Sequence, residues 1–97
     1  MRRYKQLTLA QLRSFSAVCR LGTYAAAARE LLLTSPAIWE QMKGLERHYG
    51  RKLLLRKGNG VVPTADGLQL RGMIRSVLAG LDSTREALLQ SGGARPE

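Results

Sequence analysis

The segment from residue 23 to residue 46, TYAAAARELLLTSPAIWEQMKGLE, most constrains how this chain can fold. Its four consecutive alanines favour a helix with little side-chain bulk, against which another helix can pack closely. The Thr-Ser-Pro sequence at 34–36 is typical of a helix start, because the missing N–H of proline costs nothing in the first turn. Two short helices joined by a few residues form a helix-turn-helix, whose second helix can enter the major groove of DNA.

A further helix is predicted ahead of this segment. Thr8 and Gln11 fit a capping box, in which each side chain accepts a hydrogen bond from the other residue's backbone N–H. Apolar residues follow at helical spacing and predict one buried face: Leu9, Leu12, Phe15, Val18 and Cys19. Gly22 can adopt the left-handed conformation that ends a helix. We expect the second helix to follow, from Tyr24 to about Leu32.

The third helix is predicted to begin at the cap formed by Thr34 or Ser35 and to end at Gly50. Its buried stripe has helical spacing and consists of Ile38, Met42, Leu45 and Tyr49. Residues 51–56 and 61–64 then form two short predicted strands, separated by the turn formers Lys57-Gly58-Asn59-Gly60. A two-stranded hairpin in this position is a wing. The predicted fold is therefore mostly α, a winged helix-turn-helix.

The last predicted helix starts after Thr64 and extends to about Gln90, although glycines at 67, 72 and 80 weaken the prediction of one continuous helix. It carries a heptad seam with one polar break: Leu70, Ile74, Val77, Leu81, Thr84 and Leu88. We expect this seam to meet the same seam of a second chain in a homodimer. The alternative is that it packs back on its own domain.

The predicted organisation is a DNA-binding domain over 1–64, a linker and dimerisation helix over 65–90 and a disordered tail over 91–97. The 97 residues, 44% of them hydrophobic, suffice for one small packed domain. Lys and Arg total 16 against 7 Asp and Glu, a net charge of +9. Nucleic acid is the first partner that such a charge indicates, and an anionic membrane surface is the second.

The placement of the charge favours nucleic acid over a membrane. A membrane-surface protein would carry its basic residues along the polar flank of the last helix. Here six of them cluster around the end of the third helix and the wing, opposed only by Glu46: Lys43, Arg47, Arg51, Lys52, Arg56 and Lys57. We therefore expect no membrane partner.

Several other classes of protein do not fit the sequence. One cysteine, Cys19, and one histidine, His48, supply neither a disulfide nor a zinc-ligand set, so we expect no metal and no cofactor. No nucleophile–base pair or phosphate-cradling glycine loop indicates an enzyme. No apolar run is long enough to span a membrane, and the basic lead-in at residues 1–7 is not a signal peptide. A cytoplasmic, nucleoid-associated protein is expected.

The candidate DNA contacts lie at the start of the third helix, on its outer face and near the wing tip: Thr34, Ser35, Pro36, Lys43, Arg47, Arg56 and Lys57. Hydroxyls and free N–H groups at a helix N-terminus can bind a phosphate or a base edge. The cations on the outer face can reach phosphates or guanine acceptors. The cations of the wing are expected to follow the DNA backbone or to enter a neighbouring minor groove.

Three further candidate contacts have two interpretations each. Trp39 either packs its ring at the edge of the core, which we favour, or contacts a thymine methyl or a sugar. Glu40 either accepts a hydrogen bond from cytosine N4 or pairs with Lys43 one turn on. Tyr24 either hydrogen-bonds a phosphate or packs beside Phe15.

Residues 9–89 resemble the N-terminal DNA-binding domain and linker helix of LysR-type transcriptional regulators. That family typically shows Leu-x-x-Phe, Gly-Ser-Phe, Ser-Gln-Pro-Ala-Leu-Ser, Gln-Ile-x-x-Leu-Glu, a glycine, and a Leu-Phe-x-Arg wing ending Leu-Thr-x-x-Gly. The matching residues are Leu12 and Phe15, Gly22-Thr23-Tyr24, Thr34 to Trp39, Gln41-Met42 with Leu45-Glu46, Gly50, Leu53 to Arg56, and Pro63-Thr64 with Gly67.

The resemblance implies a winged helix-turn-helix that regulates transcription, dimerises through its long last helix and binds an inverted repeat in duplex DNA. In the family the Ser-Gln-Pro turn contacts DNA, and it corresponds here to Thr34, Ser35 and Pro36. Family members commonly have Ser-Arg where this chain has Trp39 and Glu40. A Trp followed by an acid is similar instead to the winged helix of molybdate-responsive regulators.

The resemblance also implies what this chain lacks. The family's effector-binding domain is expected to be absent, because nothing after Leu89 can hold a small ligand. The chain is then either an excised fragment or a short stand-alone regulator. A different class of function stays open, a winged-helix module that binds protein rather than DNA, and Trp39 and Glu40 on the predicted reading face favour it.

Overall fold

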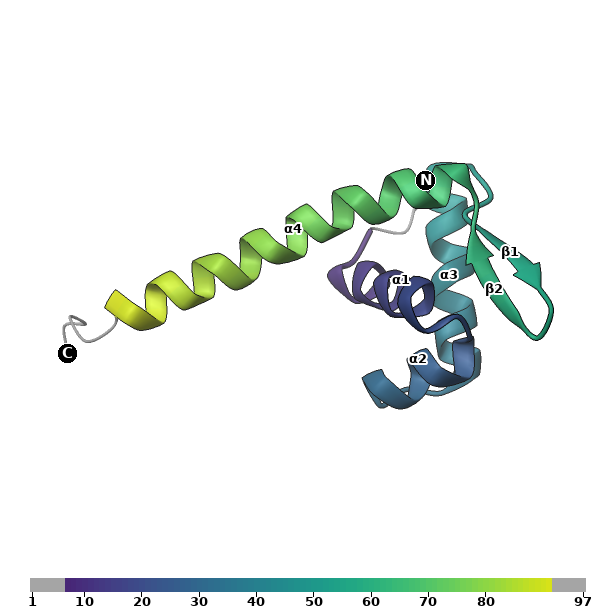
Figure 1. The fold of residues 1–97 in the computed structure, drawn as a ribbon, viewed down its shortest axis with the longest axis horizontal. Helices are drawn as coiled ribbons and strands as arrows, with labels where there is room; N and C mark the ends of the chain where they lie inside the picture. Colours follow the sequence, from purple (N-terminus) through teal and green to yellow (C-terminus); the bar gives the residue numbers. More distant parts are fainter. Residues whose placement is uncertain (1–6, 92–97) are drawn as a thin grey trace, which may run out of the picture.

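Three short helices and a β-hairpin form a small module, from which a long fourth helix extends (Figure 1). The computed structural model describes residues 7–91. In chain order these form α1 (Leu9–Leu21), α2 (Tyr24–Leu31), α3 (Ser35–Tyr49), β1 (Leu54–Lys57), β2 (Gly60–Pro63) and α4 (Ala65–Gln90). The winged helix-turn-helix predicted from the sequence is confirmed. Residues 1–6 of the predicted lead-in and 92–97 of the predicted tail lie outside the described residues.

Each helix begins after a threonine whose hydroxyl accepts a hydrogen bond from a backbone N–H three residues on. The caps are Thr8, Thr23, Thr34 and Thr64, with oxygen–nitrogen distances of 3.1, 3.0, 3.1 and 3.0 Å. These bonds satisfy N–H groups that the first helical turn leaves without partners. Gln11 Oε1 also accepts from the Thr8 N–H at 2.9 Å, which confirms the predicted capping box.

The first three helices end in the left-handed conformation, but not always at a glycine. Gly22 and Gly50 close α1 and α3 with φ of 84° and 65°, as the sequence predicts. At the end of α2 the same conformation falls on Leu32, with φ of 59° and a side chain that is 90% exposed. A leucine in this conformation carries strain that a glycine avoids. Because Leu32 leaves the helical conformation, α2 ends at Leu31, one residue earlier than predicted.

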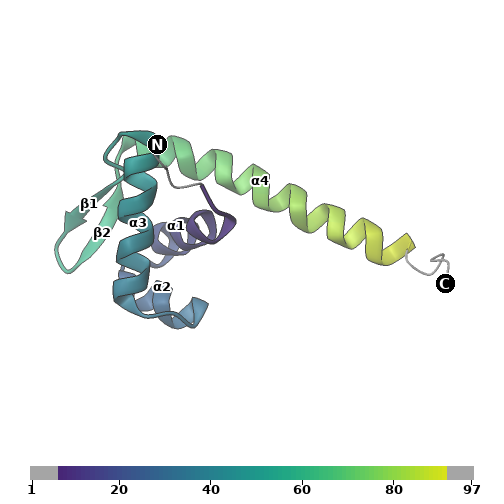
Figure 2. The ribbon, with the colours of Figure 1, turned by 180° about the vertical axis from the view of Figure 1, so that it is seen from behind.

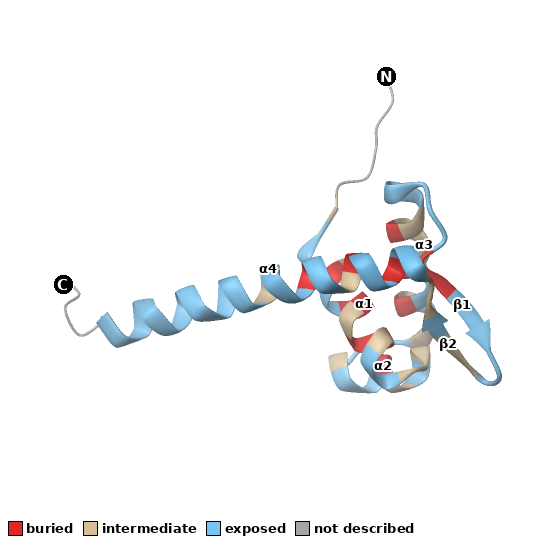
Figure 3. Ribbon diagram, turned by 45° about the horizontal axis from the view of Figure 1, so that its top comes forward, coloured by how far each residue is buried: buried red, intermediate tan, exposed pale blue. Residues whose placement is uncertain are grey.

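The core lies where α1, α2 and α3 meet the first turns of α4, as the buried segments of Figure 3 show. Its fully buried large side chains are apolar except for one serine: Phe15, Ile38, Met42, Leu45, Ile74, Val18 and Ser14. Ala27 and Ala28 are buried on α2, where their small size lets the neighbouring helices approach. Leu9 and Tyr49 were predicted to be buried but are 43% and 37% exposed, because they lie at helix ends beyond the packed region.

The wing is attached to the module at both ends. Strands β1 and β2 pair in antiparallel fashion from Leu54 with Pro63 to Lys57 with Gly60. The Val61 N–H donates to the Gly22 carbonyl at 2.9 Å, and the Thr64 N–H donates to the Leu53 carbonyl at 3.0 Å. Residues 51–53, which were predicted as strand, instead connect α3 to β1. The first strand is short because Leu53 uses its backbone groups to dock the wing rather than to pair with β2.

Helix α4 is continuous over 26 residues despite its glycines. The burial of its first turns shows that part of the predicted dimer seam is wrong. Leu70 and Ile74 are only 8% and 0% exposed, because the first turns of α4 pack on their own module across α1. These two residues therefore belong to the domain's core and are not free to meet a partner. Farther along, Val77, Leu81 and Leu88 are 39%, 46% and 64% exposed.

Candidate nucleic-acid interface

The outer face of α3 is open and lies beside the wing (Figure 2). Burial of Ile38, Met42 and Leu45 fixes the rotation of the helix, so the residues opposite this stripe face outward. Of the candidate contacts on α3, Thr34, Pro36, Trp39, Glu40 and Arg47 are exposed, whereas Ser35 and Lys43 are half-buried. The N-terminal end of α3 and its outer face are thus accessible to a large partner.

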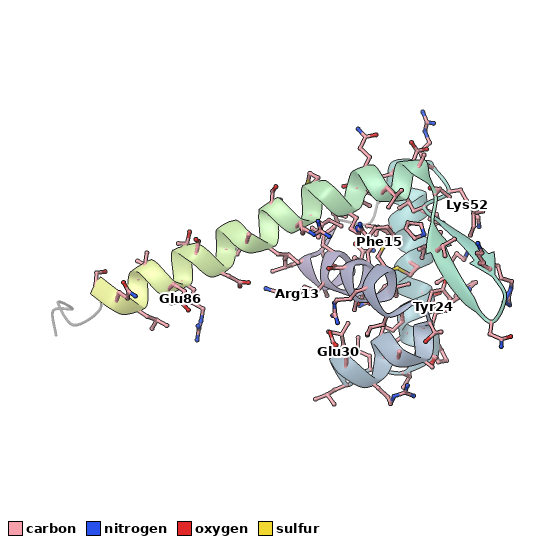
Figure 4. All side chains as sticks on the ribbon, viewed as in Figure 1. Arg13, Phe15, Tyr24, Glu30, Lys52 and Glu86 are labelled. Carbon is pink, nitrogen blue, oxygen red and sulfur yellow. The ribbon has the colours of Figure 1, made fainter. Side chains whose placement is uncertain are left out.

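A hollow of about 340 Å³ separates α3 from the wing, and we call it the helix–wing hollow. It is lined by Thr23, Tyr24, Trp39, Lys43, Lys52, Leu54, Arg56, Asn59, Gly60 and Val61. Three of these side chains are cations, contributed by α3, by the segment before β1 and by β1 itself. Figure 4 labels Tyr24 and Lys52, which reach the hollow from different elements. The hollow suits an anionic group that also accepts hydrogen bonds.

Tyr24 presents a protonated hydroxyl to this hollow. The residue is half-buried and packs against the core, while its predicted contact with Phe15 stays a prediction. Burial raises the pKa of the Tyr24 phenol, and the charge of Glu46 adds to this, while Lys43 and Arg56 oppose it without reversing it. The hydroxyl therefore keeps its proton at neutral pH and can donate a hydrogen bond to a phosphate oxygen.

Trp39 and Lys43 interact with each other on the outer face. The Lys43 ammonium lies 5.4 Å from the centroid of the Trp39 ring, at a distance suited to a cation–π interaction. Trp39 is 47% exposed, which does not support the packing at the edge of the core that we favoured. Lys43 Nζ also lies 3.4 Å from Glu46 Oε1. Lys43 therefore pairs with Glu46, and its pair with Glu40, one of the two alternatives for that residue, is not observed.

Glu46 joins α3 to the wing, a role that sequence reasoning missed. Its Oε2 accepts hydrogen bonds from the backbone N–H groups of Leu53 at 2.8 Å and Leu54 at 3.1 Å. Burial alone raises the pKa of the Glu46 carboxyl, but these N–H donors and the charges of Lys43 and Lys52 outweigh it and lower that pKa. The sequence feature that could have indicated this role is a single acidic residue inside a basic run. Its carboxylate holds the wing through one oxygen and pairs with Lys43 and Lys52 through the other.

The remaining basic residues lie around the hollow rather than in it. A shallow depression of about 280 Å³ at the end of α3 is lined by Lys43, Glu46, Arg47, Gly50, Arg51 and Lys52. Arg51 also lies 3.6 Å from Asp66 of α4. Lys57 is exposed at the wing tip, where it pairs with Gly60. The structure thus brings Tyr24, Trp39, Lys43 and Arg56 together and leaves the other candidates spread around them.

Other kinds of site find little support in the described part of the chain. Residues 7–91 contain no cluster of three side chains suited to a metal ion. Cys19 is half-buried, and burial raises the pKa of its thiol to about 11 despite the nearby charge of Arg71. His48 is exposed and packs edge-on against Tyr49. None of the helices in these residues has the length and apolar character needed to cross a membrane.

Comparison with known proteins identifies the family of this chain. Residues 9–68 match the model of a family described as "Bacterial regulatory helix-turn-helix protein, lysR family". The chain belongs to this family. The resemblance drawn from the sequence motifs is thereby confirmed, and the matched range covers α1 to α3, the wing and the start of α4.

The relatives of this LysR-family chain include transcriptional regulators that are much longer than it is. It is 40% identical over 91 residues to the HTH-type transcriptional regulator CbbR of Sinorhizobium medicae, a match covering 94% of this chain and 29% of that protein. It is 45% identical over 64 residues to the regulator AbaB of Streptomyces antibioticus, covering 66% and 21%. The chain therefore spans less than a third of the length of these curated relatives.

Solved structures of similar fold include two DNA complexes. The BenM DNA-binding domain with catB site 1 DNA has a TM-score of 0.85 and 25% identity, over 92% of this chain and 99% of that one. The CbnR DNA-binding domain with DNA has a TM-score of 0.74 and 35% identity, over 86% and 98%. These matches cover nearly all of both DNA-binding domains, so this LysR-family chain has the fold and the extent of those two domains.

Proposed function

We propose that this chain is the DNA-binding part of a transcriptional regulator, and that it binds duplex DNA as a homodimer. The observation that carries the proposal is the helix–wing hollow, in which Lys43, Lys52 and Arg56 surround a phenol that can donate a hydrogen bond. An exposed helix beside such a cationic hollow suits a major groove flanked by its phosphates. The DNA complexes of BenM and CbnR support the same assignment.

In this proposal the parts of the site have distinct roles. The N-terminal turn of α3, with Thr34, Ser35 and Pro36, enters the major groove, where hydroxyls and free N–H groups meet base edges and phosphates. In the hollow, a phosphate of the DNA backbone is bound by Tyr24, Lys43 and Arg56. Arg47 at the end of α3 and Lys57 at the wing tip extend the positive surface along the backbone.

The dimer follows from α4. Its exposed side chains Val77, Leu81 and Leu88 continue beyond the module, and a helix with an apolar stripe is stabilised by a partner that covers it. Two-fold symmetry would present two copies of α3 and so favour an inverted repeat. The proposed location is the cytoplasm, on the nucleoid.

The test is the salt dependence of DNA binding. Neutralising one phosphate contributes about 0.9 to the slope of log affinity against log salt. Because a homodimer carries each substitution twice, we expect Lys43→Ala and Arg56→Ala each to flatten the slope by about two and to weaken binding. Arg13→Ala removes the same charge from α1, away from the wing (Figure 4), and should leave the slope unchanged. Wild-type slopes in both hollow variants would overturn the assigned contacts.

A second candidate function is a protein-binding winged helix. It is favoured by Trp39, an aromatic side chain 47% exposed on the reading face, since exposed aromatic side chains are enriched at protein interfaces. The same titrations separate the two functions. Failure to bind any duplex DNA at low salt would exclude the first function and leave the second.

A further inference from the structure

We propose that Glu40 selects a cytosine in each half-site of the DNA, an inference that rests on the proposed function and makes it more specific. Glu40 lies in the second turn of α3 and is exposed. At 100° per residue its side chain points away from the buried Ile38 and Met42 and lies one turn after Pro36. The Glu40 side chain therefore lies on the same exposed face of α3 as Pro36 and meets the same partner.

The carboxylate of Glu40 is available because nothing described in the chain neutralises it. Within residues 7–91 the ion pairs of acidic side chains join Glu30 to Arg20, Glu46 to Lys43 and Lys52, and Asp66 to Arg51. Lys43 is the cation closest to Glu40 along the helix. Its ammonium instead lies 3.4 Å from Glu46 and 5.4 Å from the Trp39 ring centroid, which holds it toward the wing.

A carboxylate on this face discriminates between bases by hydrogen-bond chemistry. An ionised glutamate only accepts hydrogen bonds, and only cytosine N4 and adenine N6 donate in the major groove. Guanine and thymine present acceptors, which repel it. The adenine amino group lies between two acceptors, its own N7 and thymine O4, whereas the cytosine amino group has an acceptor on one side only. Cytosine is therefore the base that a lone carboxylate prefers.

The same carboxylate penalises other bases, which makes it a determinant of specificity rather than of affinity. Phosphates repel Glu40 at every site, so it weakens binding to DNA in general. Where it meets guanine, it is desolvated against acceptors and gains no hydrogen bond in return. We expect sites with guanine in place of the cytosine to bind roughly tenfold to hundredfold more weakly.

The experiment is selection of bound sequences from a random duplex pool, carried out with the full chain and three variants. The wild-type protein should enrich one fixed cytosine in each half-site. In Glu40→Gln that position should change to adenine, since an amide can bond adenine N6 and N7 together. In Glu40→Ala the position should lose its preference while the rest of the site persists, and binding to unrelated DNA should become several-fold tighter.

Glu86→Gln is the matched control, because it removes the same charge from an exposed position on the far part of α4 (Figure 4). Its enriched sequence should equal that of the wild type. Enriched sites that are identical for wild type, Glu40→Gln and Glu40→Ala would overturn the role of Glu40 but leave DNA binding intact. Absence of any enriched sequence also overturns it. The salt dependence of Arg56→Ala then decides separately whether the proposed function stands.

Discussion

At the scale of single residues, Leu32 pairs an unfavourable backbone conformation with almost complete exposure. Its φ of 59° strains an L-residue, and its side chain, 90% exposed, contributes little packing in return. We expect Leu32→Gly to raise the free energy of unfolding by roughly 0.5–1 kcal/mol, after allowing for the greater chain entropy of glycine. Urea denaturation measures this. Leu33→Gly, where φ is negative, should bring no such gain, and a loss of stability in Leu32→Gly would contradict the argument.

Glu46 makes the stability of the wing depend on pH. Its pKa is lower in the folded chain than in the unfolded chain, so its contribution is complete above the ordinary glutamate pKa of about 4.3. That contribution is lost as the pH falls through the lowered folded-state pKa. We expect thermal melting at a series of pH values to show this loss, and Glu46→Gln to reduce it and to cost about 1–3 kcal/mol at neutral pH.

Glu30 supplies the control for this prediction. Its hydrogen bond with Arg20 also lowers its pKa, but the pair lies on the surface, where solvent screens it. Glu30→Gln should therefore change the pH dependence much less than Glu46→Gln. Equal effects of the two substitutions would show that Glu46 does not have the special role of holding the wing.

At the scale of elements, the start of α4 is fixed by its close approach to the chain before the wing. A Cβ atom on Gly67 would lie 2.2 Å from the Leu53 carbonyl oxygen, an atom that also accepts the Thr64 N–H bond. We expect Gly67→Ala to destabilise the protein by about 2 kcal/mol, because two backbone segments must separate. Chemical denaturation with a comparison of DNA affinity would reveal both the loss of stability and any displacement of the wing.

Gly72, also in α4, provides the opposite case. A Cβ atom there meets nothing within 4 Å. Gly72→Ala should therefore gain up to about 1 kcal/mol from helix propensity alone. The two alanine substitutions in one helix differ only in their surroundings. If both stabilise the protein, the close contact at Gly67 does not constrain the fold.

At the scale of the whole molecule, α4 separates into a half that completes the module and a half that is open to a partner. Leu81 is 46% exposed beyond the core. We expect the wild-type chain to be dimeric in light scattering at micromolar concentration and Leu81→Asp to be monomeric with an intact module. Ala79→Asp places the same charge on the opposite side of α4 and should remain dimeric. A monomeric wild type would exclude this helix as the dimer interface.

The site could be predicted from the sequence only in part. The basic run and the exposed face of α3 point to Lys43, Arg47 and Arg56 without any coordinates. Two features escape such reasoning. Glu46 was counted as an opposing charge, and the partner of Lys43 was not determined, because Glu40 and Glu46 lie equally close to it along the helix. Which of the two it meets depends on where the wing docks.

The sequence by itself determined where the helices begin and the kind of fold they form. Threonine caps and buried stripes depend on residues three or four positions apart in the chain. Such patterns can be recognised in the sequence without knowledge of the tertiary structure. Only the tertiary structure decided that Leu70 and Ile74 belong to the core, and that α3 and the wing enclose a cationic hollow. The physical reason is that a helix has the same apolar spacing whether it packs on its own module or on a second chain.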